Sequence, residues 1–154
     1  MFWLFKSDKL DCQRTICDVY NESDLSEFIK FIERCPDNPS IKDGGFECSP
    51  EIPLIVQLIK THHPEANNTL ECVEKLIDNG ADISSSKWLD MFPITPFFAA
   101  INWTYWIQPD MIRLLLEKGI DKEQVKQAID RIDRHIKKDL QNIGVWDEII
   151  EYIK

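Results

Sequence analysis

The chain has 154 residues, with 18 Lys and Arg residues against 27 Asp and Glu residues, and its formal net charge is −9. This length is sufficient for a single domain, residues 1–154, with a substantial apolar core. The negative charge argues against direct binding of nucleic acid, because a phosphate backbone requires a basic surface. It favours a basic protein as the partner.

The first five residues, Met1–Phe5, are apolar, but Lys6, Asp8 and Lys9 follow directly. The stretch is too short for a secretory signal or a membrane span, and charges interrupt every other apolar run. We therefore expect a soluble protein without a membrane span, in which Met1–Phe5 covers the first helix pair. A tail that touches a membrane or a partner is the alternative for this segment.

Residues 8–35 predict the first helix pair, with helices over Asp8–Tyr20 and Ser23–Cys35. Ser23 and Asp24 are typical residues at a helix N-terminus. Pro36–Gly45 has the proline and glycine content of a loop. Eleven acidic and five basic residues lie in Asp8–Glu51, which predicts an acidic docking face there. Its candidate partner-binding residues are Asp37, Asp43 and Glu47, although a solvated surface explains any single carboxylate equally well.

The five cysteines are an odd number without close pairing in the sequence: Cys12, Cys17, Cys35, Cys48 and Cys72. Several fall at positions that a helix would bury, so we expect unpaired thiols in a reducing, cytoplasmic compartment. No cysteine or histidine spacing matches a zinc site, and no phosphate loop or nucleophile motif is present. We expect no metal, no cofactor and no catalytic residue, and an enzyme is the weaker alternative.

Residues 49–80 predict the second helix pair. The run Asn68-Thr69-Leu70-Glu71 resembles a capping box, and Gly80 follows the last apolar turn of the second helix. The segment after it, Ser84–Pro93, has the composition of an extended loop. Five large aromatic residues fall within nineteen positions of this loop and the next connector: Trp88, Phe92, Trp103, Tyr105 and Trp106.

These five aromatic residues have two interpretations. Tryptophan and tyrosine are frequent anchors of protein interfaces, which makes all five candidate partner-binding residues. Alternatively, they pack on one another and attach the long loops to the helices. We expect some of the five to serve each purpose.

Residues 95–119 predict the third helix pair, and here a family resemblance is clearest. Ile94–Ala100, with the sequence ITPFFAA, resembles the motif that opens the first helix of an ankyrin repeat. Leu76–Ile83 resembles the end of the second ankyrin helix, and Leu115–Asp121 repeats that ending 39 residues later. The resemblance covers Asn68–Asp121 well and Asp8–Lys60 loosely, and Phe98 replaces the usual histidine of the motif.

The resemblance implies an all-α fold in which helix pairs stack as an ankyrin-like repeat array. It also implies recognition of another protein, without catalysis. Long connectors at Thr61–Asn67 and Asn102–Gln108 depart from the family pattern. A longer finger at Ser84–Ile94 is a further departure.

Residues 122–153 predict C-terminal cap helices. The longest helix is expected to begin after Asp121 and to continue to Ile143, with one apolar stripe, and a short helix is expected over Trp146–Ile153. A helix with one solvent-exposed face and one buried face suits the terminal cap of a stack. A homodimer seam is the alternative use of the same stripe.

The sequence thus favours a non-catalytic protein-binding module. The small size and negative charge suit an inhibitor or an immunity-type protein that occludes a basic partner. The alternative is a self-associating structural scaffold.

Overall fold

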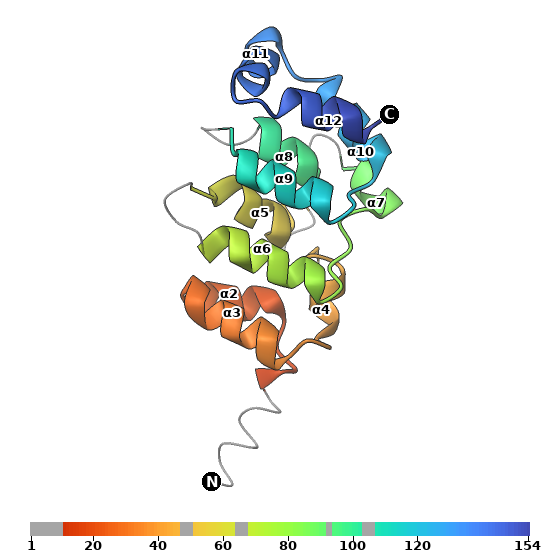
Figure 1. The fold of residues 1–154 in the computed structure, drawn as a ribbon. Helices are drawn as coiled ribbons and strands as arrows, with labels where there is room; N and C mark the ends of the chain where they lie inside the picture. Colours follow the sequence, from red (N-terminus) through yellow and green to blue (C-terminus); the bar gives the residue numbers. More distant parts are fainter. Residues whose placement is uncertain (1–10, 47–50, 64–67, 92–93, 103–106) are drawn as a thin grey trace, which may run out of the picture.

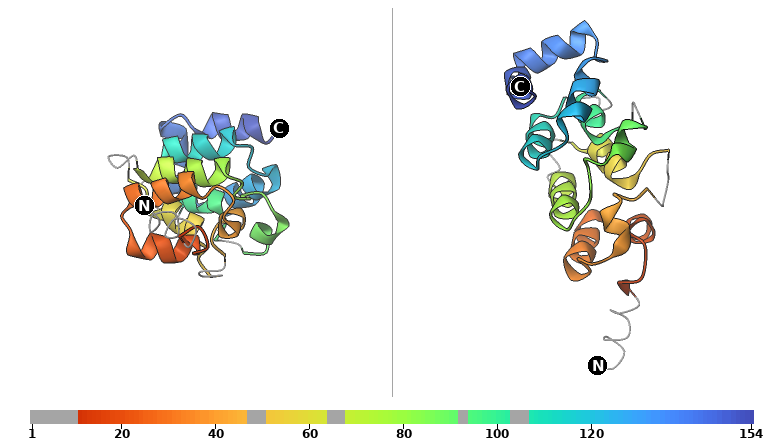
Figure 2. Two further views of the ribbon diagram at one scale, coloured as in Figure 1. Left: turned by 90° about the horizontal axis from the view of Figure 1, so that it is seen from below. Right: turned by 90° about the vertical axis from the view of Figure 1, so that its right-hand side faces the viewer.

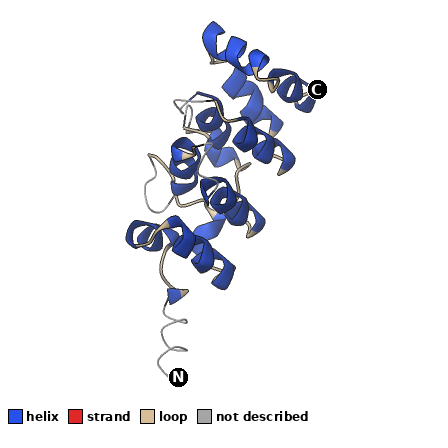
Figure 3. Ribbon diagram, turned by 60° about the vertical axis from the view of Figure 1, so that its left-hand side comes forward, coloured by secondary structure: helices blue, strands red, loops and turns tan. Residues whose placement is uncertain are grey.

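The structure is a computed structural model that describes residues 11–46, 51–63, 68–91, 94–102 and 107–154. Within these ranges the regular elements are all helices, as Figure 3 shows, so the prediction of an all-α protein is confirmed. No helix in the described ranges is long and apolar enough to span a bilayer. The helices are α2 (Ile16–Glu22), α3 (Leu25–Arg34), α4 (Pro39–Lys42), α5 (Leu54–Thr61), α6 (Asn68–Asp78), α7 (Ser86–Leu89), α8 (Pro96–Asn102), α9 (Pro109–Glu117), α10 (Lys122–Ile129), α11 (Arg134–Asn142) and α12 (Trp146–Tyr152).

The helices are arranged in pairs that pack layer upon layer (Figures 1 and 2). Helix α2 packs on α3, α5 on α6, and α8 on α9. One row of contacts runs from α3 to α6 to α9, and a second row runs from α5 to α8 to α10. The short helices α4 and α7 lie in the loops between pairs. The two rows place residues far apart in sequence on a common surface.

Three helices end in the same way because a glycine follows each of them. Gly80, Gly119 and Gly144 have φ angles of 100°, 79° and 81°, a conformation that is accessible to glycine without strain. The amide of the next residue then donates back to a carbonyl in the last turn: Ala81 to Leu76, Ile120 to Leu115, and Val145 to Leu140. This is the Schellman pattern, and it directs the small or apolar residue after each glycine into the core.

The core extends through all the layers. Helix α8 has the most complete burial: each residue from Phe97 to Ile101 is at most 5 % exposed, and Pro96 is buried as well. A helix that is apolar on all sides requires cover on all sides. Helices α5, α9 and α10 supply that cover. A helix pair does not bury its apolar surface alone, so each pair is stabilised by packing on a neighbouring layer.

The loops between pairs are joined by their own hydrogen bonds. The amide of Asp82 donates to the carbonyl of Lys42 over 3.0 Å, and the amide of Asp121 donates to Ser84 Oγ over 3.0 Å. Gln124, 1 % exposed, donates from Nε2 to the carbonyl of Ile83 and accepts from the amide of Phe97 at Oε1. The loops thus follow the layering of the helices.

Several predicted element boundaries are wrong. Asp8–Leu10 of the predicted helix Asp8–Tyr20 lie outside the described residues. In the described part, α2 begins at Ile16 because Thr15 Oγ1 caps it by accepting from the amide of Asp18, and α2 continues past Tyr20 to Glu22. The loops predicted at Pro36–Gly45 and Ser84–Pro93 contain α4 and α7.

The single long helix predicted after Asp121 is two helices. Asp133 caps a new helix, α11, by accepting from the amide of Ile136. Asp133 lies in the middle of the apolar stripe and interrupts the predicted helix there, because aspartate favours a helix N-terminus over a helix interior. Leu140 is the buried residue of α11, and Ile143 is 41 % exposed.

The cysteine prediction is also wrong in part. Cys12 and Cys35 form a disulfide with Cα atoms 5.3 Å apart, and Cys17 is disulfide-bonded as well. The argument for a reducing compartment rested on unpaired thiols, so it loses its basis. Cys72 is a free thiol and is buried in α6.

Burial raises the pKa of the Cys72 thiol from 9.0 to about 12. The neutral thiol is therefore favoured in the folded state. The buried neutral thiol therefore contributes to the free energy of unfolding. This contribution is complete below the pKa that the thiol has in the unfolded chain, and it is lost as the pH rises toward about 12.

We expect native Cys72 to resist iodoacetamide at pH about 9, where an exposed thiol of pKa about 8.5 is mostly ionised. It should react at once in urea. Mass spectrometry of alkylated peptides measures both states. Rapid labelling of Cys72 in the folded chain would contradict the buried position.

Two glycine substitutions should separate backbone strain from steric overlap. Gly119→Ala places a Cβ in open space, so only the left-handed conformation costs, by about 1–2 kcal/mol. Gly45→Ala has the same strain, and its Cβ would lie 2.5 Å from Leu54 Cβ. We expect it to lower the free energy of unfolding by at least about 1 kcal/mol more. Urea denaturation followed by circular dichroism measures both, and equal losses would contradict the predicted overlap.

Candidate functional site

Ion pairs connect neighbouring helices of the row α3, α6 and α9, which we call the outer row, and a further pair joins α9 to α12. In each case a cation on one helix, or at its end, reaches a carboxylate on the next helix along the stack. The pairs are Lys75–Glu33 at 2.9 Å, Lys118–Asp78 at 2.7 Å and Arg113–Glu148 at 3.0 Å. They join α6 to α3, α9 to α6, and α9 to α12.

The two lysines among these three cations are held in the protonated state by their partners. A hydrogen bond to Glu33 raises the pKa of Lys75, and a hydrogen bond to Asp78 raises the pKa of Lys118. Both side chains lie at the surface, where water and salt weaken such pairs. These ion pairs therefore fix the positions of the carboxylates on the surface more than they stabilise the fold.

An open groove of about 670 Å³ lies between α9 and α12. Its apolar part comes from Leu116 and Tyr152, both half-buried. Tyr152 is fixed in place because its hydroxyl donates to the carbonyl of Ile120. Exposed carboxylates make up the rest of the lining: Glu117, Asp147, Glu148 and Glu151.

A second groove, of about 390 Å³, lies on α6, one layer away in the same row. It is lined by Leu70, Glu71, Glu74, Lys75 and Asp78. We call the carboxylates of the two grooves the outer acidic face: Glu71, Glu74, Asp78, Glu117, Asp147, Glu148 and Glu151.

The outer acidic face is only partly neutralised. Among the described residues, Glu71, Glu117 and Asp147 make no ion pair within 4.0 Å. The outer acidic face is therefore a negatively charged surface in which exposed carboxylates surround small apolar patches at the base of each groove. Such a surface attracts Lys and Arg side chains, whose methylene stems lie on apolar groups while their charges meet carboxylates.

The structure places Trp88 in the core. Its side chain is 0 % exposed, its ring centroid lies 4.4 Å from that of Phe46, and its Nε1 donates to the carbonyl of Asp82 over 2.6 Å. The ring therefore attaches the loop before α5 to the loop before α8. The partner-binding role predicted for Trp88 is corrected to the alternative packing role, because a buried ring offers no surface to a partner.

The predicted acidic residues of the first third differ from one another. Asp37 is exposed. Asp43 is half-buried and its Oδ1 accepts from the amide of Gly45 over 2.9 Å, so it supports the turn that leads to α5. The other predicted partner-binding residues lie outside the described residues: Glu47, Phe92, Trp103, Tyr105 and Trp106.

A buried histidine joins the second and third pairs. His62 Nε2 lies 2.9 Å from Asp110 Oδ2, and Gln108 donates from Nε2 to the carbonyl of His62. Within the described residues, His62 Nδ1 and Gln108 Oε1 have no hydrogen-bond partner. The His62 side chain is 0 % exposed and the Asp110 side chain is 39 % exposed, so this pair connects the end of α5 to the start of α9 and reaches solvent at Asp110. No group of three or more metal-binding side chains occurs in the described ranges.

Sequence reasoning missed the outer acidic face. Its signal is present in the sequence as acidic positions three and four residues apart, at Glu71, Glu74 and Asp78 and again at Asp147, Glu148 and Glu151. Each of these runs, taken alone, is typical of the solvent-exposed face of a helix. Only the stacking of α6, α9 and α12 brings them onto one surface.

Comparisons of the chain with protein-family models, with curated proteins and with solved structures find no match. The function proposed below therefore rests on the geometry and charge of this chain alone.

We expect Trp88→Ala to lower the free energy of unfolding by about 3–5 kcal/mol, because it removes a fully buried ring. Trp88→Phe should cost less, since it keeps a ring but leaves the carbonyl of Asp82 without its donor. Urea denaturation followed by circular dichroism compares the variants. A loss below about 1 kcal/mol for Trp88→Ala would contradict the buried position.

Proposed function

We propose that this chain is a non-catalytic protein-binding module that docks a basic segment of another protein on its outer acidic face. The observation that carries the proposal is the pair of neighbouring grooves on α6 and between α9 and α12, both rich in exposed carboxylates. The net charge of −9 adds long-range attraction for such a partner.

An ankyrin-like repeat array remains part of this proposal. The layered helix pairs, the glycine-terminated second helices and the loops joined between layers support it. A stacked array presents a broad, rigid surface without an enclosed pocket, which suits recognition of a protein better than that of a small molecule. A partner held in this way would have its basic surface covered, as an inhibitor or immunity-type protein requires.

The ion pairs between layers bear on how the surface recognises a partner. Lys75, Arg113 and Lys118 each engage a carboxylate of a neighbouring layer, so they do not compete freely for the unpaired carboxylates. Glu117 and Asp147 border the larger groove and make no ion pair within the described part of the chain. These two residues are the best positions at which to test the proposal.

Self-association is the second candidate function. Ile143 is the exposed large apolar residue at the outer end of the stack, and Ile132 and Ile136 are only half-buried. A second copy that covers them would form a homodimer whose stability depends little on salt.

The test is affinity purification of the tagged chain from its native cells at rising salt, with three matched proteins. These are the native chain, Glu117→Lys/Asp147→Lys in the larger groove, and Asp90→Lys/Asp139→Lys as a control with the same change in charge at exposed sites elsewhere. We expect a basic protein that salt releases and whose recovery falls about tenfold with the groove variant only.

Equal loss with both variants would show attraction by net charge alone and would overturn the assignment of the face. Recovery of the chain alone, as a dimer at every salt concentration, would favour the self-associating scaffold. Recovery of an acidic partner would contradict the charge argument.

A further inference from the structure

The first helix pair is the only part of the described chain in which covalent cross-links accompany the helix packing. The Cys12–Cys35 disulfide joins the turn before α2 to the residue after α3, and Cys17 within α2 is also disulfide-bonded. The Cys12–Cys35 bond spans 23 positions of sequence and encloses both helices.

The position of Cys35 gives this disulfide a structural purpose. The second helices of the next two pairs, α6 and α9, end with a left-handed glycine that turns the chain into the core. At the end of α3, Cys35 is the C-cap residue, with a φ of −122°, and its amide donates to the carbonyl of Phe31. Pro36 follows it at the place where α6 and α9 have their glycine. The chain leaves α3 without a Schellman turn. The disulfide instead ties this end to the start of the pair.

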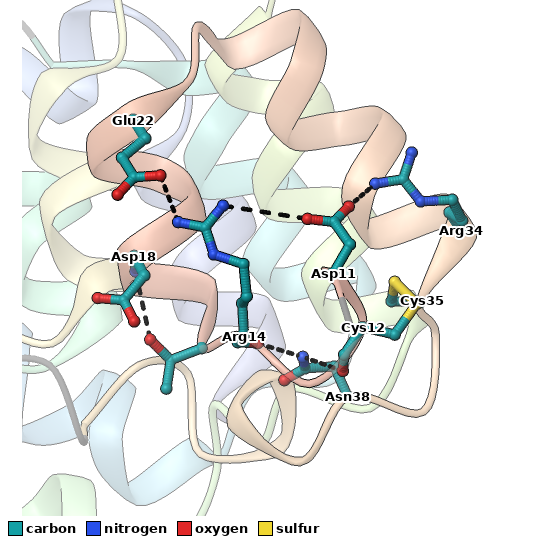
Figure 4. A network of polar contacts seen from close by, with 9 residues as sticks. Asp11, Cys12, Arg14, Asp18, Glu22, Arg34, Cys35 and Asn38 are labelled. Atoms are coloured by element: carbon teal, nitrogen blue, oxygen red, sulfur yellow. Dashed lines mark hydrogen bonds and ion pairs between the residues drawn. A yellow bond between two sulfur atoms is a disulfide. The ribbon is translucent and has the colours of Figure 1, made fainter. Parts of the chain in front are cut away.

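A polar network surrounds the disulfide (Figure 4). Asp11 lies between Arg14 and Arg34 and forms an ion pair with each, and Arg14 also pairs with Glu22. Asn38 donates from Nδ2 to the carbonyls of Cys12 and Arg14.

The ion pairs of this network are between partly exposed side chains, which stabilise weakly by themselves. The Asp11–Arg34 pair requires that Asp11 be held beside the end of α3. The disulfide supplies that constraint, so this pair depends on it.

The rest of the first pair is attached to the stack on one side. Helix α3 packs on α6, and its Glu33 pairs with Lys75. An element at the end of a stack has one neighbouring layer where an internal element has two, and it opens at a lower free energy when its other constraints are removed. Without its disulfides the first pair is therefore the least stable part of the array.

We propose that the first helix pair is a redox-controlled end cap and that this chain matures in an oxidising environment. With the disulfides formed, the cap is folded on α6. On reduction, the cap opens while the layers from α5 to α12 stay folded. A dithiol supplies the reduction: its thiolate attacks one sulfur, the S–S bond breaks, two electrons and two protons yield two cysteine thiols, and the dithiol becomes a disulfide.

The first test is hydrogen exchange, read by mass spectrometry, of the full chain before and after treatment with dithiothreitol. We expect amide exchange in residues 16–34 to accelerate at least tenfold, with an upper value of about 300-fold from the entropy of the loop that the Cys12–Cys35 bond closes. Residues 96–129 should exchange at unchanged rates. The same samples, alkylated before and after reduction, report the thiol state of Cys12, Cys17 and Cys35.

Two variants complete the design. Cys12→Ser/Cys35→Ser should show the faster exchange in residues 16–34 without reductant. Cys72→Ser, which alters the free thiol, should respond to reduction as the native chain does. If the double variant does not fold, reduction of the folded native chain remains the deciding measurement.

Three results would overturn the proposal. One is unchanged exchange in residues 16–34 after complete reduction, which would make the disulfides dispensable. Another is simultaneous unfolding of all layers, which would make them global rather than local constraints. The third is the finding of free thiols at Cys12 and Cys35 in the chain purified from its native cells without reductant. None of these results bears on the outer acidic face, so this proposal and the proposed function fail separately.

Discussion

The fold depends on mutual burial between layers, and helix α8 shows why. Its residues from Pro96 to Ile101 are all buried, so it has no face that can contact water. Helix α5 covers it on one side, α10 on another, and α9 completes the pair. Each helix pair is thus stable because of its neighbours, as in other stacked architectures. The grooves between helices and the hydrogen bonds between loops follow from this arrangement, because the stacking fixes the position of each helix relative to the next.

Local sequence signals predicted the elements best where a capping residue, a proline or a glycine marks at least one end of the helix. Helices α6, α8, α9 and α12 lie close to their predicted positions, and Gly80 and Gly119 have the left-handed conformation expected of helix ends. Prediction was wrong where two local signals compete. Asp133 lies within an apolar stripe, and its capping hydrogen bond to the amide of Ile136 divides the predicted helix in two.

Features that depend on distant contacts could not be predicted from the sequence. The Cys12–Cys35 bond needs α2 and α3 to fold back on each other, and sequence spacing alone does not establish that. Trp88 lies in a segment that is predicted as a loop but forms α7, and its burial depends on Phe46 from the loop before α5. The outer acidic face likewise combines residues from separate layers. The acidic composition predicted a charged surface, but only the packing determines which carboxylates share it.

The bonds of Gln124 bear on whether the array tolerates truncation before α10. A chain ending before α10 would lack this side chain, and the buried carbonyl of Ile83 and amide of Phe97 would lose their partner. It would also uncover one side of α8. Helix α10 is therefore not an optional extension of the array, because the burial of α8 and the closure of two loops in the preceding layers require it.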